Sequence, residues 1–513
     1  MINPSFQQLL YSQPLDTWFI SGAMEVDTLV GEVYQNLLGH ELEKNSSKAK
    51  TTLKVVLLNL YSTAISDPDL HLRYSRDENF YSSSNHYVSQ AVSYQSLVTK
   101  VIPGLLRLSL ISDYPGFIDR EFNTGFMSRM KSREGLIELF SKHELQPWML
   151  ETSVDKEVIL LKDQDKKFKK YKDTEFTRTA REQLQHINRH LEAAYVDLMI
   201  TDEAMEELLS RLKRSSSEED DKHLNLFSNQ TLYRIFSNSS WKQHGRFYGG
   251  WWQNIPQKDK VFENGQEIDI KVHNRQHISI NGSPTVELDY SSFHPRMLYH
   301  LCGCEMAGDP YVGIGDLDRD HGKTLVNMII NAVDEDKANE AYREEYRDEG
   351  VTKAETKIAI EAAKEKHNAI SDSFFTGVGL QLMNYDSHIA NNVMLRAIDE
   401  FHTVILPVHD SFICITEFED NLRKLMMEEY VEVMKSEVPP GVDMKYSGHY
   451  QTEEEKLFMS EYGTPYDCDI PVDPRQKERQ GVLQKQAYDA RRKYGIRFED
   501  AFTQESMKEK YGE

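Results

Sequence analysis

The chain has 513 residues, of which 39% are hydrophobic, and it carries a formal net charge of −23. This length predicts about three domains with enough apolar side chains for a sizeable core. No apolar run approaches the roughly 20 residues that span a bilayer, so we expect no membrane partner. The N-terminus lacks the layout of a signal peptide, and four cysteines are too few for a disulfide framework. The expected location is therefore a reducing cytoplasm.

The negative charge disfavours a general nucleic-acid binder, because such proteins usually carry a basic surface. The acidic residues are unevenly placed, however, with runs at Glu218–Asp221 and Glu453–Glu455 and a third over residues 340–365. Each run is most simply a solvated face, and an acidic surface could also serve a protein partner. A basic stretch, Lys166–Lys172, remains among these acidic segments.

The N-terminal pattern is helical. Residues 1–45 predict a helical lead-in, and apolar residues at helical spacing predict a helix over 48–64. Residues 87–112 then predict two short helices joined near Ser93, followed by a basic hairpin over 123–131. Helix, turn, helix and basic hairpin is the order of a winged helix-turn-helix, and a small helical packing domain is the alternative. We assign residues 1–150 to this region.

The middle of the chain changes character near residue 229. Residues 174–213 predict long helices that could act as a thumb, and a serine-rich and acidic linker follows. Strands over 277–280 and 285–288 flank Asn281-Gly282, a dipeptide that favours a hairpin turn. Residues 335–367 are charged and helical in pattern.

We expect four regions along the chain. Residues 1–150 are the helical region, and residues 151–228 are a thumb-like helical region with a linker. Residues 229–450 would form the main α+β domain. Residues 451–513 are a polar tail, with a helical pattern from Gln476 to Tyr494.

Two aspartates carry the strongest chemical signal. Asp289 and Asp410 each follow a strand-like run where a tight turn begins. Two carboxylates presented by neighbouring strands can hold two divalent cations roughly 4 Å apart, which is the arrangement of many phosphoryl-transfer sites. An isolated aspartate at a strand end is more often a turn cap, so the metal-site prediction depends on the blocks around the pair.

Five blocks occur in a fixed order: Gly245–Pro256, Leu288–Leu301, Arg319–Asn331, Tyr385–Ile389 and Val408–Phe412. Together they resemble the palm and fingers of a family A (DNA polymerase I-like) polymerase, a superfamily that includes the phage-type single-subunit RNA polymerases. Asp-Tyr-Ser resembles motif A, Arg-x-x-x-Lys resembles motif B and Val-His-Asp resembles motif C. The resemblance covers about residues 230–450 and implies an antiparallel palm sheet with short helical fingers.

The resemblance also implies roles for individual residues. Asp289 and Asp410, with the Tyr290 carbonyl, would bind two Mg²⁺ ions, for which Mn²⁺ could substitute. Arg319 and Lys323 lie one helical turn apart and could grip nucleotide phosphates, and Lys323 could also donate a proton to pyrophosphate. The further substrate-binding candidates are Arg246, His294, Asn327, Asn331, His388 and His409. The rings of Tyr290, Trp251 and Trp252 offer stacking faces for bases, but for the two tryptophans a core or wall position is favoured over stacking.

Three positions depart from the family pattern. The residue five after the motif A aspartate screens the sugar 2′ position, and it is glutamate in DNA enzymes and glycine in phage RNA polymerases; here it is His294. Asn327 and Asn331 replace the aromatic residues expected four and eight positions after the motif B lysine. Base stacking and sugar choice therefore depart from the family pattern.

The expected function is Mg²⁺-dependent nucleotidyl transfer from nucleoside triphosphates to a nucleic-acid 3′ end. A DNA polymerase on a primer–template, without proofreading, is the leading prediction. A single-subunit RNA polymerase or primase and a template-independent transferase are close alternatives. The alternative of another class is a non-catalytic DNA-binding replication or regulatory protein with a vestigial palm.

Overall fold

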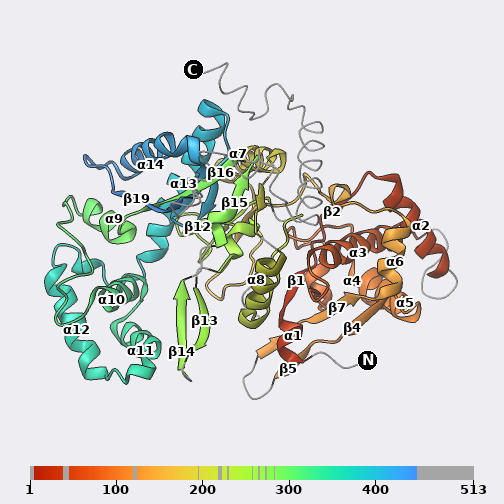
Figure 1. Ribbon diagram of the computed structural model, residues 1–513, viewed down its shortest axis with the longest axis horizontal. Helices are drawn as coiled ribbons and strands as arrows, with labels where there is room; N and C mark the ends of the chain where they lie inside the picture. Colours follow the sequence, from red (N-terminus) through yellow and green to blue (C-terminus); the bar gives the residue numbers. More distant parts are fainter. Residues whose placement is uncertain are drawn as a thin grey trace.

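The computed structural model describes residues 5–37, 46–119, 124–194, 196–200, 202–217, 222–227, 230–256, 258–263, 266–271, 274–281 and 283–447. It is a mixed α+β structure whose sheets are mostly antiparallel. The first 150 residues lie at one end, the main sheet lies near the middle, and the helices of residues 319–366 lie at the other end (Figure 1). Across these residues, no helix combines the length and apolar character needed to cross a membrane. The predicted tail and its helical pattern lie outside the described residues.

The N-terminal unit combines helices with a four-stranded sheet of order β1-β3-β7-β4. The predicted helix over 48–64 is confirmed as α3. The lead-in is only partly helical, because two short strands interrupt it; strands of two or three residues are too short to show a period in sequence. The elements are α1 (Phe6–Leu10), β1 (Ser12–Pro14), β2 (Phe19–Ile20), α2 (Met24–Leu37), α3 (Ser47–Ser66) and β3 (His71–Tyr74).

Ser93 does not join two helices, which corrects the prediction for residues 87–112. Its hydroxyl accepts a hydrogen bond from the Ser96 N–H, so it caps the start of one continuous helical segment. The strands that follow form an extended hairpin before α6. These elements are α4 (Tyr94–Ser96), a π-helical turn (Leu97–Val101), α5 (Ile102–Arg107), β4 (Ile111–Tyr114), β5 (Phe117–Asp119), β6 (Thr124–Phe126), β7 (Ser128–Ser132) and α6 (Glu134–Lys142).

Two sheets occupy the middle of the chain. One has the order β12-β11-β9, and the other has the order β10-β15-β16-β18-β17 with β19 also paired to β16. The predicted hairpin is confirmed, and Asn281 takes a positive φ of 52° where its turn begins. The strands of these two sheets are β9 (Ile159–Leu161), β10 (Val196–Leu198), β11 (Tyr233–Phe236), β12 (His244–Tyr248), β15 (Ile278–Ile280), β16 (Ser283–Tyr290), β17 (Leu406–Val408), β18 (Ser411–Ile415) and β19 (Val442–Ser447). Separately, β8 (Glu151–Thr152) pairs with β2, and β13 (Lys258–Glu263) pairs with β14 (Gln266–Lys271).

Long helices flank these sheets. The predicted helical stretch over 174–213 is confirmed as α7 and α8, with β10 between them, and the helical pattern over 335–367 is confirmed as α11 and α12. The helices are α7 (Glu175–Ala193), α8 (Asp202–Ser215), α9 (Phe293–Leu301), α10 (Arg319–Asn331), α11 (Glu335–Glu345), α12 (Lys353–Lys366), α13 (Gly379–Phe401) and α14 (Glu419–Met434).

The buried residues form two hydrophobic clusters. The smaller runs from Phe19 to Leu150, and the larger spans Val158 to Met434 with Tyr11 and Leu70 added from the N-terminal segment. The buried side chains of α7 and α8 belong to the larger cluster, so the thumb-like region and the main sheet share one core.

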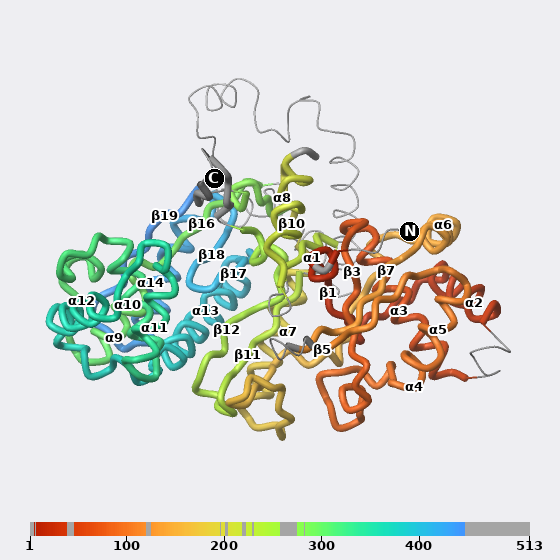
Figure 2. Tube along the Cα trace, turned by 90° about the horizontal axis from the view of Figure 1, so that it is seen from below, coloured from red at the N-terminus to blue at the C-terminus, as the bar shows by residue number. Residues whose placement is uncertain are grey.

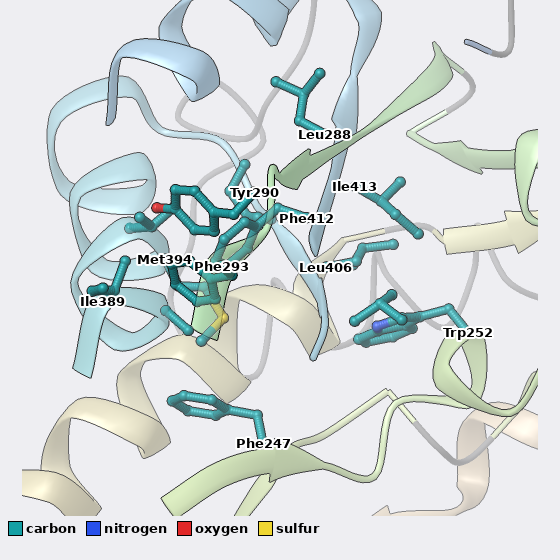
Figure 3. Packing of buried hydrophobic residues seen from close by; sticks show 14 of the residues in the cluster. Phe247, Trp252, Leu288, Tyr290, Phe293, Ile389, Met394, Leu406, Phe412 and Ile413 are labelled. Carbon is teal, nitrogen blue, oxygen red and sulfur yellow. The ribbon is translucent and has the colours of Figure 1, made fainter. Parts of the chain in front are cut away.

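Aromatic rings expected to stack on bases lie inside this core instead. Trp251 and Trp252 are fully buried, and the Tyr290 ring stacks on Phe293 with centroids 4.2 Å apart while its hydroxyl donates to the Met426 carbonyl. Figure 3 shows Trp252 and Tyr290 packed with apolar side chains of β16, β18 and α13. The stacking prediction for Tyr290 is therefore wrong, whereas the core position favoured for the two tryptophans is confirmed.

Candidate active site

The structure brings Asp289 and Asp410 together. Strands β16 and β18 pair antiparallel with Asp289 opposite Ser411, so Asp410 immediately precedes the partner of Asp289. The tight turn between β17 and β18 depends on His409, which adopts a left-handed φ of 57°. Burial and the nearby charge of Asp410 together raise the pKa of Asp289 to about 6.

One oxygen of Asp289 has no protein partner. Its Oδ1 is buried and accepts no hydrogen bond from any residue that the structure describes, whereas Oδ2 pairs with Nζ of Lys445 at 3.1 Å. A buried acceptor without a partner costs about 1–3 kcal/mol, so such an atom usually serves a ligand or an ion. Two adjacent carboxylates with a free oxygen fit Mg²⁺, which takes few protein ligands and keeps water or phosphate oxygens.

The donor set is small. Within the described ranges, no group of three or more His, Cys, Asp or Glu side chains is arranged to hold a metal ion. A cation between Asp289 and Asp410 would therefore depend on backbone, water and substrate oxygens for its remaining ligands. The ligand role expected of the Tyr290 carbonyl stays a prediction.

Glu287 supplies a buried carboxylate next to Asp289, and the sequence analysis assigned it no role. Glu287 is two residues before Asp289 and therefore faces the same side of β16. It is fully buried and accepts two hydrogen bonds from Arg275, at 2.8 and 3.0 Å, and one from the Ser411 hydroxyl at 2.6 Å. Lys445 of β19 lies 3.4 Å from Glu287 and bridges it to Asp289. The available signal was an acidic residue inside the apolar strand Val286-Glu287-Leu288.

Arg246, which belongs to the first of the five sequence blocks, is held inside the site by neighbouring side chains. Nε of Arg246 donates to Oδ2 of Asp386 at 2.6 Å, and Nη2 lies 3.3 Å from Nε2 of His294. Because arginine only donates, Nε2 of His294 accepts, and the ring carries its proton on Nδ1. Burial and the Arg246 charge lower the pKa of His294 to about 4, so the imidazole is neutral.

Asp386 joins this cluster from α13 and was not predicted as a site residue. It is 1% exposed, and burial raises its pKa to about 7, with Asp410 acting in the same direction and Arg246 opposing. Figure 1 places α13 beside the main sheet, and its buried residues belong to the same hydrophobic cluster as those of β16 and β18. The blocks containing Arg246, His294, Asp386 and the two aspartates thus meet around one point.

The predicted phosphate-binding residues lie on α10. Arg319, Lys323, Asn327 and Asn331 recur every four residues and share one helix face. Arg319 is held by Asp309 at 2.7 Å, whereas the exposed Lys323 makes no ion pair or hydrogen bond with any residue in the described part of the chain.

Tyr311 connects α10 to the aspartates. The Arg319 guanidinium lies 5.4 Å from the centre of its buried ring. Burial raises the pKa of the Tyr311 hydroxyl, which bonds the Ser292 side chain and experiences the charges of Arg319 and Asp410. Gly322 makes this contact possible, because a Cβ atom there would lie 2.1 Å from the Tyr311 carbonyl oxygen.

The two other histidines differ in position. His409 is exposed beside Asp410, and its ring lies 6.3 Å from that of Tyr248 on β12. His388 points toward α7, where its ring lies 6.5 Å from Phe176. Its expected role at the edge of the site stays a prediction.

Comparisons with known proteins add little to this geometry. No family model and no curated protein matches the sequence. Among solved structures, the POL domain of Pol1 from M. smegmatis, in complex with a DNA primer-template and dNTP, is similar over 82% of this chain and 72% of that chain. The TM-score is 0.31 and the sequence identity 12%. Backbones that differ this much do not establish a shared fold.

Proposed function

We propose that this protein is a Mg²⁺-dependent nucleotidyltransferase that extends a nucleic-acid 3′ end, with a DNA polymerase as the specific activity. The observation that carries the proposal is the juxtaposition of Asp289 and Asp410 at one sheet end, with a buried and unpartnered oxygen on Asp289. In this view, the sheet of β16, β18 and β19 is the palm and the helices α10 to α12 are short fingers.

Each residue of the candidate site would have a distinct role in nucleotidyl transfer. Asp289 and Asp410 would hold the divalent cations next to the 3′ end. Lys323 and Arg319 would bind the triphosphate, since they share the exposed face of a helix that Tyr311 connects to the aspartates. Arg246 would orient His294 at the position where the sugar lies. When bound, Mg²⁺ would neutralise phosphate charge and lower the pKa of the attacking hydroxyl.

The decisive experiment is primer extension with Mg²⁺, offering dNTPs and NTPs separately, with and without a template. We expect template-dependent incorporation of dNTPs that Asp289→Asn and Asp410→Asn each reduce by at least about 1,000-fold, the scale of charge stabilisation in such sites. Exposed aspartates elsewhere, such as Asp336→Asn on α11, provide the matched control. Wild-type incorporation of NTPs alone would make the protein an RNA polymerase, and wild-type inactivity with retained DNA binding would favour the binding-protein alternative.

We propose further that residues 1–150 bind duplex DNA as a winged helix. The sheet order β3-β7-β4, with a helical segment before β4 and a hairpin between β4 and β7, supports this assignment. Phe117 and Ile118 on the hairpin are 49% and 71% exposed, which suits contact with a groove. Ile118→Asp in the full chain should weaken a duplex gel shift while leaving primer extension on short substrates intact; an unchanged shift would remove this role.

A further inference from the structure

A cationic loop stands outside the site in this otherwise acidic protein. We propose that residues 162–172, here called the lysine loop, bind single-stranded nucleic acid beside the candidate active site. The binding claim stands on the loop itself, and its purpose, to hold an unpaired strand during synthesis, rests on the proposed function.

The lysine loop is a built structure. It leaves β9 as a short hairpin in which Lys162 pairs with Phe168 and the Lys169 N–H donates to the Leu161 carbonyl at 2.8 Å. Oδ1 of Asp163 accepts the N–H groups of Asp165 and Lys167, both at 2.9 Å, and so fixes the tip. A flexible charge run would need none of these bonds.

The exposed lysines of the loop are not paired with acidic side chains in the described part of the chain. Five lysines are exposed, and none forms an ion pair there; the Nζ of Lys169 donates to the Ser239 hydroxyl, at 3.1 Å. Some lysines elsewhere are paired, as Lys213 is with Asp67 and Asp69. Unpaired cations close together attract a polyanion, and in a chain of net charge −23 such a cluster is unusual. The five are Lys166, Lys167, Lys169, Lys170 and Lys172.

An aromatic ring is held among these lysines. Phe168 is 52% exposed, and its ring centre lies 5.2 Å from that of Tyr87 and 5.1 Å from Nζ of Lys162. The Tyr87 hydroxyl donates to the Lys169 carbonyl at 2.8 Å and accepts the Leu161 N–H at 3.0 Å, which fixes the position of the pair. An exposed ring with cations on both sides suits stacking on unpaired bases, because bases inside a duplex are already stacked.

The loop adjoins the candidate active site through the β12-β11-β9 sheet. β9 leads into the loop, and β12 carries Arg246, so the two features lie two strands apart (Figure 2). His244 lies between them: burial and the charges of Arg246, Lys162 and His409 lower its pKa to about 4. A single nucleic-acid strand that ran from the lysine loop past His244 would reach Asp289 and Asp410 without crossing the acidic helices α11 and α12.

The test is fluorescence anisotropy of labelled oligo(dT) with the full chain, in EDTA and without nucleotides, over a range of KCl concentrations. Lys167→Gln with Lys170→Gln removes charge, Phe168→Ala removes the ring, and Lys424→Gln with Lys435→Gln at α14 is the control for exposed lysines. A blunt duplex and polyglutamate are measured in parallel. Thermal melts verify that each variant is folded.

We expect the double lysine variant to lower the affinity and to reduce the slope of log K against log salt by about 1.4, or 0.7 for each phosphate that the protein no longer neutralises. Phe168→Ala should weaken oligo(dT) binding about 5- to 100-fold with the slope unchanged. Both variants should affect the duplex less, and the control should behave as wild type.

Three results would overturn the proposal: unchanged oligo(dT) binding in both loop variants, an equal loss for duplex and single strand, or displacement by polyglutamate as effective as that by oligo(dT). The last would identify the loop as a docking surface for acidic protein segments. Failure of the nucleotidyltransferase proposal is distinguishable, because it would appear as absent incorporation by a protein whose metal-free oligo(dT) binding still depends on the loop.

Discussion

Nζ of Lys445 lies 3.1 Å from Oδ2 of Asp289, on the carboxylate that a metal ion would use. Burial lowers the pKa of this lysine, but the charges of Asp289, Glu287 and Asp410 outweigh that effect and raise it. Lys445 therefore remains charged and holds the carboxylates of Glu287 and Asp289 near one another before any cation binds.

Replacing this lysine should tighten metal binding. Lys445→Met removes a positive charge a few ångströms from the proposed site, so Mn²⁺ affinity should rise about tenfold after allowance for solvent screening. Titration of the metal-free protein with Mn²⁺, followed by electron paramagnetic resonance, measures this directly. The same variant should melt at a lower temperature in EDTA and recover when Mn²⁺ is added. Lys435→Met, a surface lysine paired with Glu432, is the control; equal affinities in all three proteins would contradict the prediction.

The ionised carboxylate of Asp289 should reduce the free energy of unfolding at neutral pH. Its pKa is raised from 3.8 to about 6, so the folded state binds this proton more tightly than the unfolded state does. The stability associated with the protonated form is present below the unfolded pKa and is lost as the pH rises through about 6. Asp289→Asn should therefore be more stable than wild type by about 1–2 kcal/mol near pH 8 in EDTA, with no difference near pH 4. Urea unfolding at both pH values measures this, and a less stable variant at the higher pH would refute it.

Gly322 should be needed for the placement of α10. In Gly322→Ala, the new methyl group meets the Tyr311 carbonyl, so we expect a loss of about 1–3 kcal/mol and weaker binding of a fluorescent dNTP. Gly31→Ala, in the interior of α2 with open space around it, should instead stabilise the chain by about 0.5–1 kcal/mol. The opposite signs of the two stability changes distinguish a steric clash at Gly322 from the general effect of replacing a helical glycine by alanine. If Gly322→Ala is destabilised but binds the nucleotide as wild type does, α10 is not part of the triphosphate site.

The ion pair of Arg246 and Asp386 should be strongly coupled. Arg246→Gln leaves a buried carboxylate without its partner and should reduce the free energy of unfolding by about 3–5 kcal/mol. Adding Asp386→Asn should restore most of that loss, and additive losses would contradict the coupling. Arg319→Gln, which breaks the exposed pair with Asp309, should change stability by less than about 1 kcal/mol.

Sequence reasoning could place Asp289 and Asp410 together because each ends a strand pattern at a turn and because the five ordered blocks resemble a polymerase palm, whose sheet can set two such strands side by side. It included Asp386 in the fourth block but assigned it no role, because the spacing along a long helix does not show which acidic side chain is buried beside Arg246. Glu287 and Lys445 were missed because their pairing depends on β19, whose alternating sequence Val442–Ser447 does not by itself show which strand it pairs with. The short strands β1, β2 and β10 are also too short to show any period.

Tyr11 packs in the larger hydrophobic cluster although it belongs to the first dozen residues, and Nζ of Lys213 lies 5.6 Å from its ring centre. Nearby, the Asn225 amide donates to Gln13 and to Ser62, at 3.0 and 2.8 Å. The start of the chain thus completes the half of the molecule that carries the aspartates. A fusion tag or a truncation at the N-terminus is consequently not a neutral change for an activity assay, even though Asp289 and Asp410 lie 278 and 399 residues after Tyr11 (289 − 11 and 410 − 11).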